Sequence, residues 1–286
     1  MRLLVLTPAP DEPRFAAIAS QWMDRLSAAL EPEGIRLDQR PWTSPGDLGE
    51  FDGVTTLLAW GYHQTPGAWD GLLDHLAESG EPVVNDVSTL RWNTRKTYLN
   101  ELQAAGAPVV PTLFVEQLSP EALSEAHARF GDQIIVKPQV SGGSFATLRV
   151  TQGDTIEQLL DAPSGPAMLQ PFMPAVAEEG ELSLVYFNGA FSHAVGKVAR
   201  AGDFRVQSQH GGVYSAISPP AEALAVAERV LAAAGRPLTY ARIDLIRDPQ
   251  GDLQLMELEA IEPDLYLEHA PDGGAAFARA MLWALD

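Results

Sequence analysis

Acidic side chains alternate with apolar ones in two neighbouring segments near the end of the chain. Arg242 and Asp244 lie two residues apart in the first segment, and Glu257 and Glu259 in the second. Because successive strand residues point to opposite faces, each pair shares one face, and Met256 and Leu258 are expected to point to the opposite one. A hairpin turning at 248–251 would bring three carboxylates and one guanidinium together. Crowded carboxylates repel unless cations neutralise them, and these oxygen ligands favour Mg²⁺ or Mn²⁺. A solvated acidic strand face is the alternative.

Lysine is rare in this sequence, and each lysine lies beside a segment that suits a phosphate group. Of 19 basic residues, only Lys96, Lys137 and Lys197 are lysines. Lys137 ends an apolar, β-branched run and precedes the loop 139–144, which contains two glycines and two serines. Such a loop can turn backbone N–H groups toward an anion while the lysine supplies charge. A plain hairpin loop would use the same residues. The sequence has no Walker pattern and no G-x-G-x-x-G fingerprint after a strand.

Several further motifs follow one another in a characteristic order. They are Asn85-Asp86, 91–99, Val136-Lys137-Pro138 with its Ser-Gly-Gly loop, 169–173, 180–183, 191–197, 241–244 and 256–259. In order and spacing they resemble the ATP-grasp carboxylate–amine ligases, and the likeness covers nearly the whole chain. It is strongest to the branch that includes the cycloserine-pathway cyclo-ligase (O-ureido-serine cyclo-ligase) and, further off, glutathione synthetase.

The resemblance implies roles for individual residues. It implies that ATP is bound by Lys96, Lys137, Ser141, Gly142, Gly143, Ser144, Gln170, Phe172, Met173 and Glu181, with Glu178 as a substitute for Glu181. The catalytic groups that would face the phosphoryl group and the substrate carboxylate are Lys197, Arg205 and Arg242. Asp244, Glu257 and Glu259 would bind two Mg²⁺ (or Mn²⁺) ions. The chain departs from many relatives at Glu259, where asparagine is common, and at Gln170, where an acid is common.

The implied reaction activates a small-molecule carboxylate as an acyl phosphate and joins it to an amine, releasing ADP and phosphate. Two alternatives stay open. One is an intramolecular cyclo-ligase acting on an amino-acid derivative, and the other is a non-catalytic ATP-binding regulator. A regulator has little need for three converging carboxylates. The sequence leaves the oligomeric state open, including a homodimer.

Composition excludes some partners. The formal net charge of −19 and the absence of a basic run disfavour nucleic acid, because binding a phosphate backbone needs a basic surface. The chain has no cysteine, which excludes disulfides and thiolate chemistry. Its opening apolar stretch is too short for a secretory signal, and no membrane span is expected, so the sequence favours the cytoplasm.

Mixed α/β and α+β elements must position these groups. Residues 1–92 predict an α/β domain with a parallel sheet, built from strands at 3–7, 35–40 and 54–59 and helices at 12–30 and 67–79. Residues 93–172 predict a lid subdomain, and 173–286 a C-terminal α+β domain with an antiparallel sheet and a metal site. The predicted ATP-grasp fold comprises these three parts.

Local signals predict the remaining elements. A helix at 93–105 would place Lys96 in its first turn, and Ser119-Pro120 would begin another helix. Asn188-Gly189 predicts a hairpin turn, and a further helix starts near 221. The segment 60–63 either lines the substrate pocket or forms an aromatic plug. His210 is expected in a substrate-contacting loop rather than as a catalyst, and His193 as a structural group.

Overall fold

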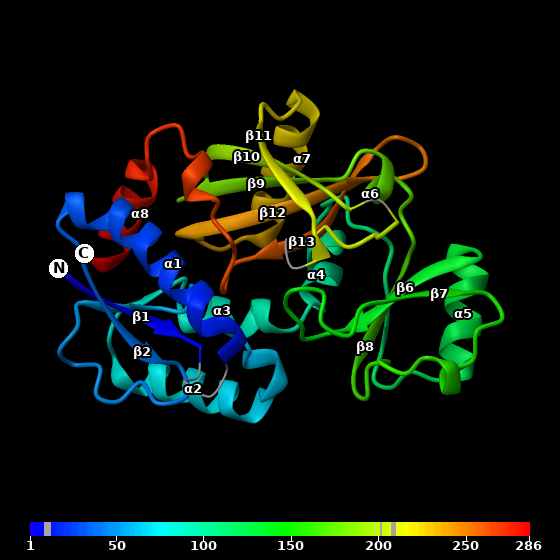
Figure 1. Ribbon diagram of the computed structural model, residues 1–286, viewed down its shortest axis with the longest axis horizontal. Helices are drawn as coiled ribbons and strands as arrows, with labels where there is room; N and C mark the ends of the chain where they lie inside the picture. The colour runs from blue at the N-terminus through cyan, green and yellow to red at the C-terminus, as the bar shows by residue number, and fades with distance from the viewer. Residues whose placement is uncertain (9–12, 201, 207–209) are drawn as a thin grey trace.

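The computed structural model describes residues 1–8, 13–200, 202–206 and 210–286. Three sheets make up three lobes, with the largest sheet in the middle, the N-terminal lobe on one side of it and a smaller lobe on the other (Figure 1). Both chain termini lie at the end of the molecule remote from the smaller lobe (Figure 1). None of the helices in the described part of the chain has the length and apolar character needed to span a membrane.

The N-terminal lobe is the predicted parallel sheet. Its strands lie in the order β2-β1-β3-β4, and all three pairings are parallel. Its elements are β1 (Arg2–Thr7), α1 (Pro13–Leu30), β2 (Arg36–Pro41), β3 (Gly53–Thr55), α2 (Pro66–Ser79), β4 (Val83–Val84) and the 3₁₀ turns η1 (Glu31–Glu33) and η2 (Tyr62–Gln64). Strand β3 is shorter than the predicted 54–59, because the chain turns after Thr55 and leads the segment 60–63 toward the other lobes. Residue 12 of the predicted first helix lies outside the described residues.

The smaller lobe is an antiparallel sheet with one helix packed on it. Its strand order is β5-β8-β6-β7. Its elements are β5 (Leu113–Val115), α5 (Pro120–Phe130), β6 (Gln133–Pro138), β7 (Leu148–Thr151), η3 (Ile156–Gln158) and β8 (Ala167–Pro171). Ser119 caps α5 as predicted, since its hydroxyl accepts from the N–H of Ala122. The loop between β6 and β7 is the predicted glycine–serine loop, which we call the flap (residues 139–147).

The central sheet carries most of the charged site. Its antiparallel order is β11-β10-β9-β12-β13. Its elements are α6 (Ala175–Glu178), β9 (Glu181–Phe187), β10 (Ala190–Val198), β11 (Val213–Ile217), α7 (Ala221–Ala234), β12 (Tyr240–Arg247), β13 (Leu253–Glu259), η5 (Leu267–His269) and α8 (Ala275–Leu285). Both predicted hairpin turns are present; Asn188 and Gly189 adopt positive φ at the first. An apolar cluster joins α7 and α4 (Tyr98–Ala104) to one face of the sheet. The other face carries the charged residues at one end, and at the other end it packs into the apolar cluster shared with the N-terminal lobe.

The predicted helix at 93–105 is wrong. The structure has α3 (Val87–Thr94) and α4 (Tyr98–Ala104), separated by a break at 95–97. Arg95 has an extended backbone, and the N–H of Lys96 donates to the carbonyl of Gln139 in the smaller lobe. That long-range hydrogen bond replaces a helical one, so Lys96 lies in a turn before α4 rather than in a first helical turn.

Candidate active site

A cavity of about 650 Å³ lies where the three lobes meet. Most of the residues that the sequence singled out line it. They are Lys96, Lys137, Ser141, Gly142, Gly143, Ser144, Gln170, Phe172, Met173, Glu181, Lys197, Arg205, Arg242, Asp244, Glu257 and Glu259. The exception is Glu178, which is exposed on α6 and is not part of the cavity wall. Segments far apart in the sequence therefore form one concave surface.

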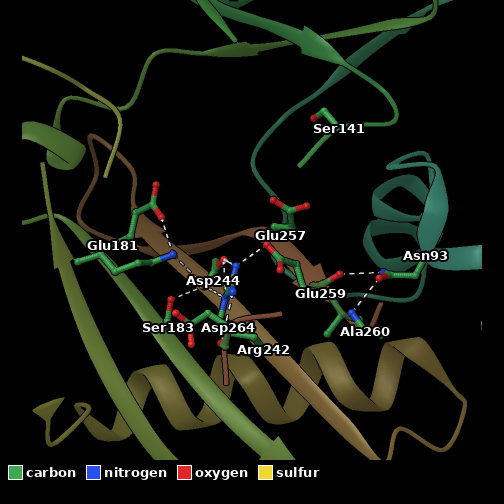
Figure 2. Close-up of polar contacts among 12 residues, drawn as sticks. Asn93, Ser141, Glu181, Ser183, Arg242, Asp244, Glu257, Glu259, Ala260 and Asp264 are labelled. Atoms are coloured by element: carbon green, nitrogen blue, oxygen red, sulfur yellow. Dashed lines mark hydrogen bonds and ion pairs between the residues drawn. The ribbon is translucent and has the colours of Figure 1, made fainter. Parts of the chain in front are cut away.

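The β12–β13 hairpin forms the floor of the cavity. Its register places Arg242 opposite Glu259 and Asp244 opposite Glu257, so the predicted faces do pair. Figure 2 shows these four side chains grouped on one side of the hairpin. A bulge after Asp244 breaks the alternation, and Met256 consequently lines the cavity instead of pointing away from it. The prediction for Met256 was wrong because alternation cannot reveal a bulge.

Asp244 is the centre of a buried ion-pair network. Arg242 donates to both carboxylate oxygens of Asp244 (Nε–Oδ1 3.1 Å, Nη2–Oδ2 3.0 Å), and Nζ of Lys197 lies 3.3 Å from Oδ1. Ser183 adds a hydroxyl donor (Figure 2). Burial opposes ionisation of Asp244, but the two cations and the hydroxyl outweigh it and hold its pKa well below its usual range. The network therefore fixes an ionised carboxylate on the cavity floor.

Lys197 joins β10 to β9 and β12. Its ammonium lies 3.2 Å from Oε2 of Glu181 as well as near Asp244. Burial would lower the pKa of Lys197, but the carboxylates raise it above its ordinary value. Gly180 makes this packing possible, because a Cβ there would collide with the carbonyl of Lys197, and its φ of +85° suits glycine.

Two carboxyl groups at the edge of the network are held in surroundings that oppose their ionisation. Burial first, and neighbouring carboxylates second, raise the pKa of Glu259 to about 8 and that of Glu262 to about 7, although Arg242 pairs with Glu259 and Lys96 offsets part of the shift at Glu262. Among the described residues, no group of three acidic, histidine or cysteine side chains is already arranged around a metal position. The donor set nevertheless fits Mg²⁺, since an added cation would relieve this repulsion and all the donors are carboxylate oxygens.

Lys96 connects the floor to the flap. Its ammonium lies 2.7 Å from Oε1 of Glu257 and donates to the carbonyl of Ser141 at 2.8 Å. Burial lowers the pKa of Lys96, but the carboxylate of Glu257 more than compensates, so the net shift is upward. Asn93 holds the adjoining strand by bonding to backbone groups of Leu258 and Ala260 (Figure 2).

Lys137 faces the cavity from β6 without a carboxylate partner. It is 8% exposed, and no described residue forms an ion pair with its ammonium. Burial and Lys96 therefore outweigh the more distant carboxylates and lower the pKa of Lys137. The flap lies beside it, and three of its residues, Gly143, Ser144 and Ala146, adopt positive φ. An anion bound here would pair with the ammonium group of Lys137.

The remaining end of the cavity next to the smaller lobe is mostly apolar. Phe172 and Met173 follow β8, and Met256 and Ile246 face them from the hairpin. The guanidinium of Arg149 covers the ring of Phe172 at 3.8 Å. The amide nitrogen of Gln170 donates to the hydroxyl of Thr112 at 2.9 Å, which fixes the orientation of that side chain. A flat heterocycle fits such a slot.

The loop after β10 contributes Arg205 and His210 to the wall. Asp203 forms a two-point contact with Arg205 (Nε–Oδ1 3.0 Å, Nη2–Oδ2 2.9 Å), which orients the guanidinium. Burial first, then Arg205, lowers the pKa of His210. His193 lies outside the cavity and bonds to Ser192 and the carbonyl of Leu265, as expected of a structural group.

No model of a known protein family matches the chain. In sequence it is 27% identical over 283 residues to the cycloserine biosynthesis protein DcsG of Streptomyces lavendulae, which covers 91% of this chain and 92% of that protein. It is 25% identical over 275 residues to glutathione synthetase of Ralstonia nicotianae, with 91% and 81% covered. The crystal structure of D-cycloserine synthetase DcsG superposes over the full length of both chains with a TM-score of 0.87 at 25% identity.

The chain has the ATP-grasp fold and is similar along nearly its whole length to ligases of that fold. Its fold recurs in D-alanine–D-alanine ligase from Bacillus anthracis complexed with ATP (TM-score 0.71, 16% identity, 100% of this chain and 97% of that one covered). It recurs also in the ATP-grasp ligase PsnB complexed with a phosphomimetic variant of its minimal precursor, Mg and ADP (0.64, 18%, 99% and 98%). Similarity to these ligases implies ATP-dependent joining of a carboxylate to an amine.

Sequence reasoning missed several residues of this ATP-grasp site. Ser183 follows Glu181 by two positions on β9 and so shares its face, a signal that the alternation contained. Asp203 precedes Arg205 by two residues, but only coordinates show their contact. Glu262 and Asp264 line the cavity after β13 ends, where no periodicity applies. All four residues of the segment 60–63 line the cavity, and Tyr62 also packs on Trp69.

Proposed function

We propose that this protein activates a small-molecule carboxylate as an acyl phosphate, using ATP, and joins it to an amine. A carboxylate oxygen attacks the γ-phosphorus of ATP and ADP leaves. The amine nitrogen then attacks the acyl carbon, phosphate leaves, and the nitrogen loses a proton. The observation that carries the proposal is the single cavity in which Lys96, Lys137, Lys197 and Arg242 meet the carboxylates of the hairpin. Positioning and charge neutralisation supply most of the catalysis in phosphoryl transfer.

The cavity divides into a base end and a phosphate end. We assign the slot at Phe172 and Met173 to adenine, with the carbonyl oxygen of Gln170 available to its amino group. Glu181 lies between this slot and the network, where it can accept from the ribose hydroxyls. Lys96 and Lys137 then face the phosphates, since both ammonium groups line the cavity beside the flap.

The hairpin carboxylates are the proposed magnesium ligands. Asp244, Glu257 and Glu259 would hold two Mg²⁺ ions, because the donors are all oxygens and the site carries surplus negative charge. When bound, Mg²⁺ neutralises charge that develops on the phosphoryl oxygens. All three carboxylates are paired with Arg242, Lys96 or Lys197 in the present structure. Arg242 and Lys197 therefore stay within reach of the transferring group once the metal takes up part of the carboxylate charge.

The flap has a protective role in this scheme. An acyl phosphate hydrolyses when water reaches it, so the cavity must close during turnover. Phe145 of the flap packs against His63 of the N-terminal lobe, with ring centroids 5.1 Å apart. Gly142 approaches Glu262 so closely that a Cβ would lie 3.3 Å from Oε1. These contacts place the flap across the cavity between two lobes.

A second candidate is intramolecular cyclisation, in which the acid and the amine belong to one molecule. The observation that favours it is the likeness to DcsG, a D-cycloserine synthetase, over the full length of both chains. Phosphate release separates the candidates: cyclisation needs one organic substrate and intermolecular ligation needs two. A non-catalytic ATP-binding regulator would release no phosphate with any combination.

The test combines candidate acids with Mg–ATP and hydroxylamine, which traps an acyl phosphate as a hydroxamate. We expect hydroxamate and stoichiometric ADP from the wild type. Arg242→Ala should abolish both while keeping most of the Mg–ATP affinity, whereas Arg279→Ala, at an exposed position of α8, should behave as wild type. Near-normal turnover of Arg242→Ala would refute the role of this residue. Phosphate release without a trapped hydroxamate for any acid would refute the acyl phosphate.

A further inference from the structure

Aromatic side chains from the N-terminal lobe and the lobe of the central sheet line a part of the cavity that is not assigned to the nucleotide. Trp22 and Trp60 meet edge to face with centroids 5.4 Å apart, and Tyr214 and Tyr266 do so at 5.5 Å. All four line the cavity and belong to one apolar cluster. Trp22 and Tyr266 also border a small void together with Asp264, which places the three next to one another. We call these four rings and Asp264 the aromatic compartment.

Asp264 brings a carboxyl group into the compartment without a matching cation, and burial raises its pKa to about 7, so a cation bound beside it would favour its ionised form. No described residue forms an ion pair with its carboxylate. Arg25 of α1 pairs with Glu268 at 3.0 Å. Arg242 reaches only the backbone carbonyl of Asp264, because its own charge is directed at Asp244 and Glu259. A buried carboxylate of this kind lacks a counter-charge that a ligand can supply.

The conformation of Tyr266 shows that this arrangement is imposed by the surroundings. Its φ is +46°, in the left-handed region, which is uncommon for a bulky residue and costs roughly 1–2 kcal/mol. Oδ1 of Asp264 accepts from the N–H of Tyr266 at 2.8 Å and so stabilises the turn. The turn directs the ring toward Tyr214. The same carboxylate therefore holds one wall of the compartment and contributes its charge.

Ring faces around a carboxylate suit a cation better than any other ligand. The negative faces of aromatic rings attract an ammonium group by about 0.5–2 kcal/mol, and Asp264 would pair with its charge. A neutral apolar ligand would leave the carboxylate without a counter-charge, and an anionic ligand would be repelled. We infer that the aromatic compartment binds the ammonium group of the amine substrate, with Asp264 as its counter-ion. This inference rests on the proposed ligase function for the identity of the ligand.

The experiment titrates the full-length protein with propylammonium chloride at constant ionic strength and follows tryptophan fluorescence. Propan-1-ol is the neutral probe of matched shape. Asp264→Asn keeps an oxygen that can accept from Tyr266 and removes only the charge. Asp24→Asn removes an exposed charge of α1 that lines neither the cavity nor the small void. Trp22→Phe tests the location of the signal, and Trp283→Phe, at a 66% exposed position on α8, is its control.

We expect saturable propylammonium binding that weakens by about tenfold or more in Asp264→Asn and stays unchanged in Asp24→Asn. Propan-1-ol should give no saturable signal, and Trp22→Phe should reduce the propylammonium signal while Trp283→Phe does not. Equal affinity of wild type and Asp264→Asn, equal binding of propan-1-ol, or no saturable binding would each overturn the inference. Calorimetry with Mg–ATP on the same samples separates the claims. Loss of nucleotide binding counts against the proposed function, whereas nucleotide binding without ammonium binding counts against the compartment alone.

Discussion

Two buried lysines face the same cavity from opposite lobes, and their surroundings differ. Lys197 on the central sheet is 4% exposed and has two carboxylate partners, Glu181 and Asp244. Lys137 on the smaller lobe is 8% exposed and has no ion-pair partner among the described residues. Burial is nearly equal, so the partners decide the outcome: the pKa of Lys197 is raised and that of Lys137 is lowered.

The protein itself neutralises the charge of Lys197, whereas a ligand must neutralise the charge of Lys137. On the central sheet, Lys197 and Arg242 are already paired with carboxylates, so the geometry of these side chains is set before any ligand binds. The smaller lobe presents a desolvated ammonium whose partner is missing, and an anionic phosphate can supply that partner. Binding of the nucleotide would then draw the smaller lobe and its flap toward the paired charges of the floor.

The same substitution at the two lysines should have unequal effects on stability. Lys197→Met leaves the buried Glu181 without its ion-pair partner and Asp244 with Arg242 as its one remaining cation, so we expect the free energy of unfolding to fall by about 3–5 kcal/mol. Lys137→Met removes a buried charge that has no partner, and the free energy of unfolding should change by less than about 1 kcal/mol or rise. Urea denaturation of both variants measures this. Equal losses would contradict the contrast.

Replacement of Lys137 should weaken nucleotide binding strongly, although it should hardly change stability. Lys137→Met should weaken Mg–ATP binding by about 10–150-fold, because a charge-assisted hydrogen bond to phosphate contributes about 1.5–3 kcal/mol. Arg129→Met, an exposed basic residue on α5 of the same lobe, should leave affinity unchanged and controls for net charge. Calorimetric titration gives both values. A Lys137→Met protein that binds Mg–ATP like wild type would show that the phosphates lie elsewhere.

A smaller loss of stability should follow removal of the Ser183 hydroxyl, which donates to Asp244 in the ion-pair network of the central sheet. Ser183→Ala removes the donor to Asp244 but leaves both cations in place, so we expect a loss of about 1–2 kcal/mol in the free energy of unfolding. Ser215→Ala on the edge strand β11 is the exposed control. No measurable difference between the two variants would mean that the cations alone fix Asp244.

Local sequence signals predicted much of this fold. The parallel N-terminal sheet, the capped helix α5 and both hairpins follow from periodicity and turn chemistry, which act over a few residues. The break at 95–97 was missed because it depends on a hydrogen bond from Lys96 to Gln139, far along the chain. Met256 was misplaced because a bulge shifts the strand by one residue.

The candidate site divides in the same way. Alternation on β12 and β13 predicted the shared face of Asp244 and Glu257, and the structure has that register. The family resemblance supplied the residues on the smaller lobe. Neither could find Asp264, since its place in the cavity depends on packing between lobes. Nor could the sequence distinguish Lys137 from Lys197, because their pKa shifts depend on which carboxylates lie nearby in space.

The most direct measurement is an NMR pH titration of the lysine side chains, which is practical because the chain has only three lysines. With ¹³Cε-labelled lysine and Lys137→Met for assignment, the pKa of Lys137 should lie below its ordinary value in the free protein, and those of Lys96 and Lys197 above it. Addition of magnesium and a non-hydrolysable ATP analogue should raise the pKa of Lys137 by pairing its charge. A Lys137 that titrates above its ordinary value without nucleotide, or whose pKa does not change when the analogue binds, would contradict the account.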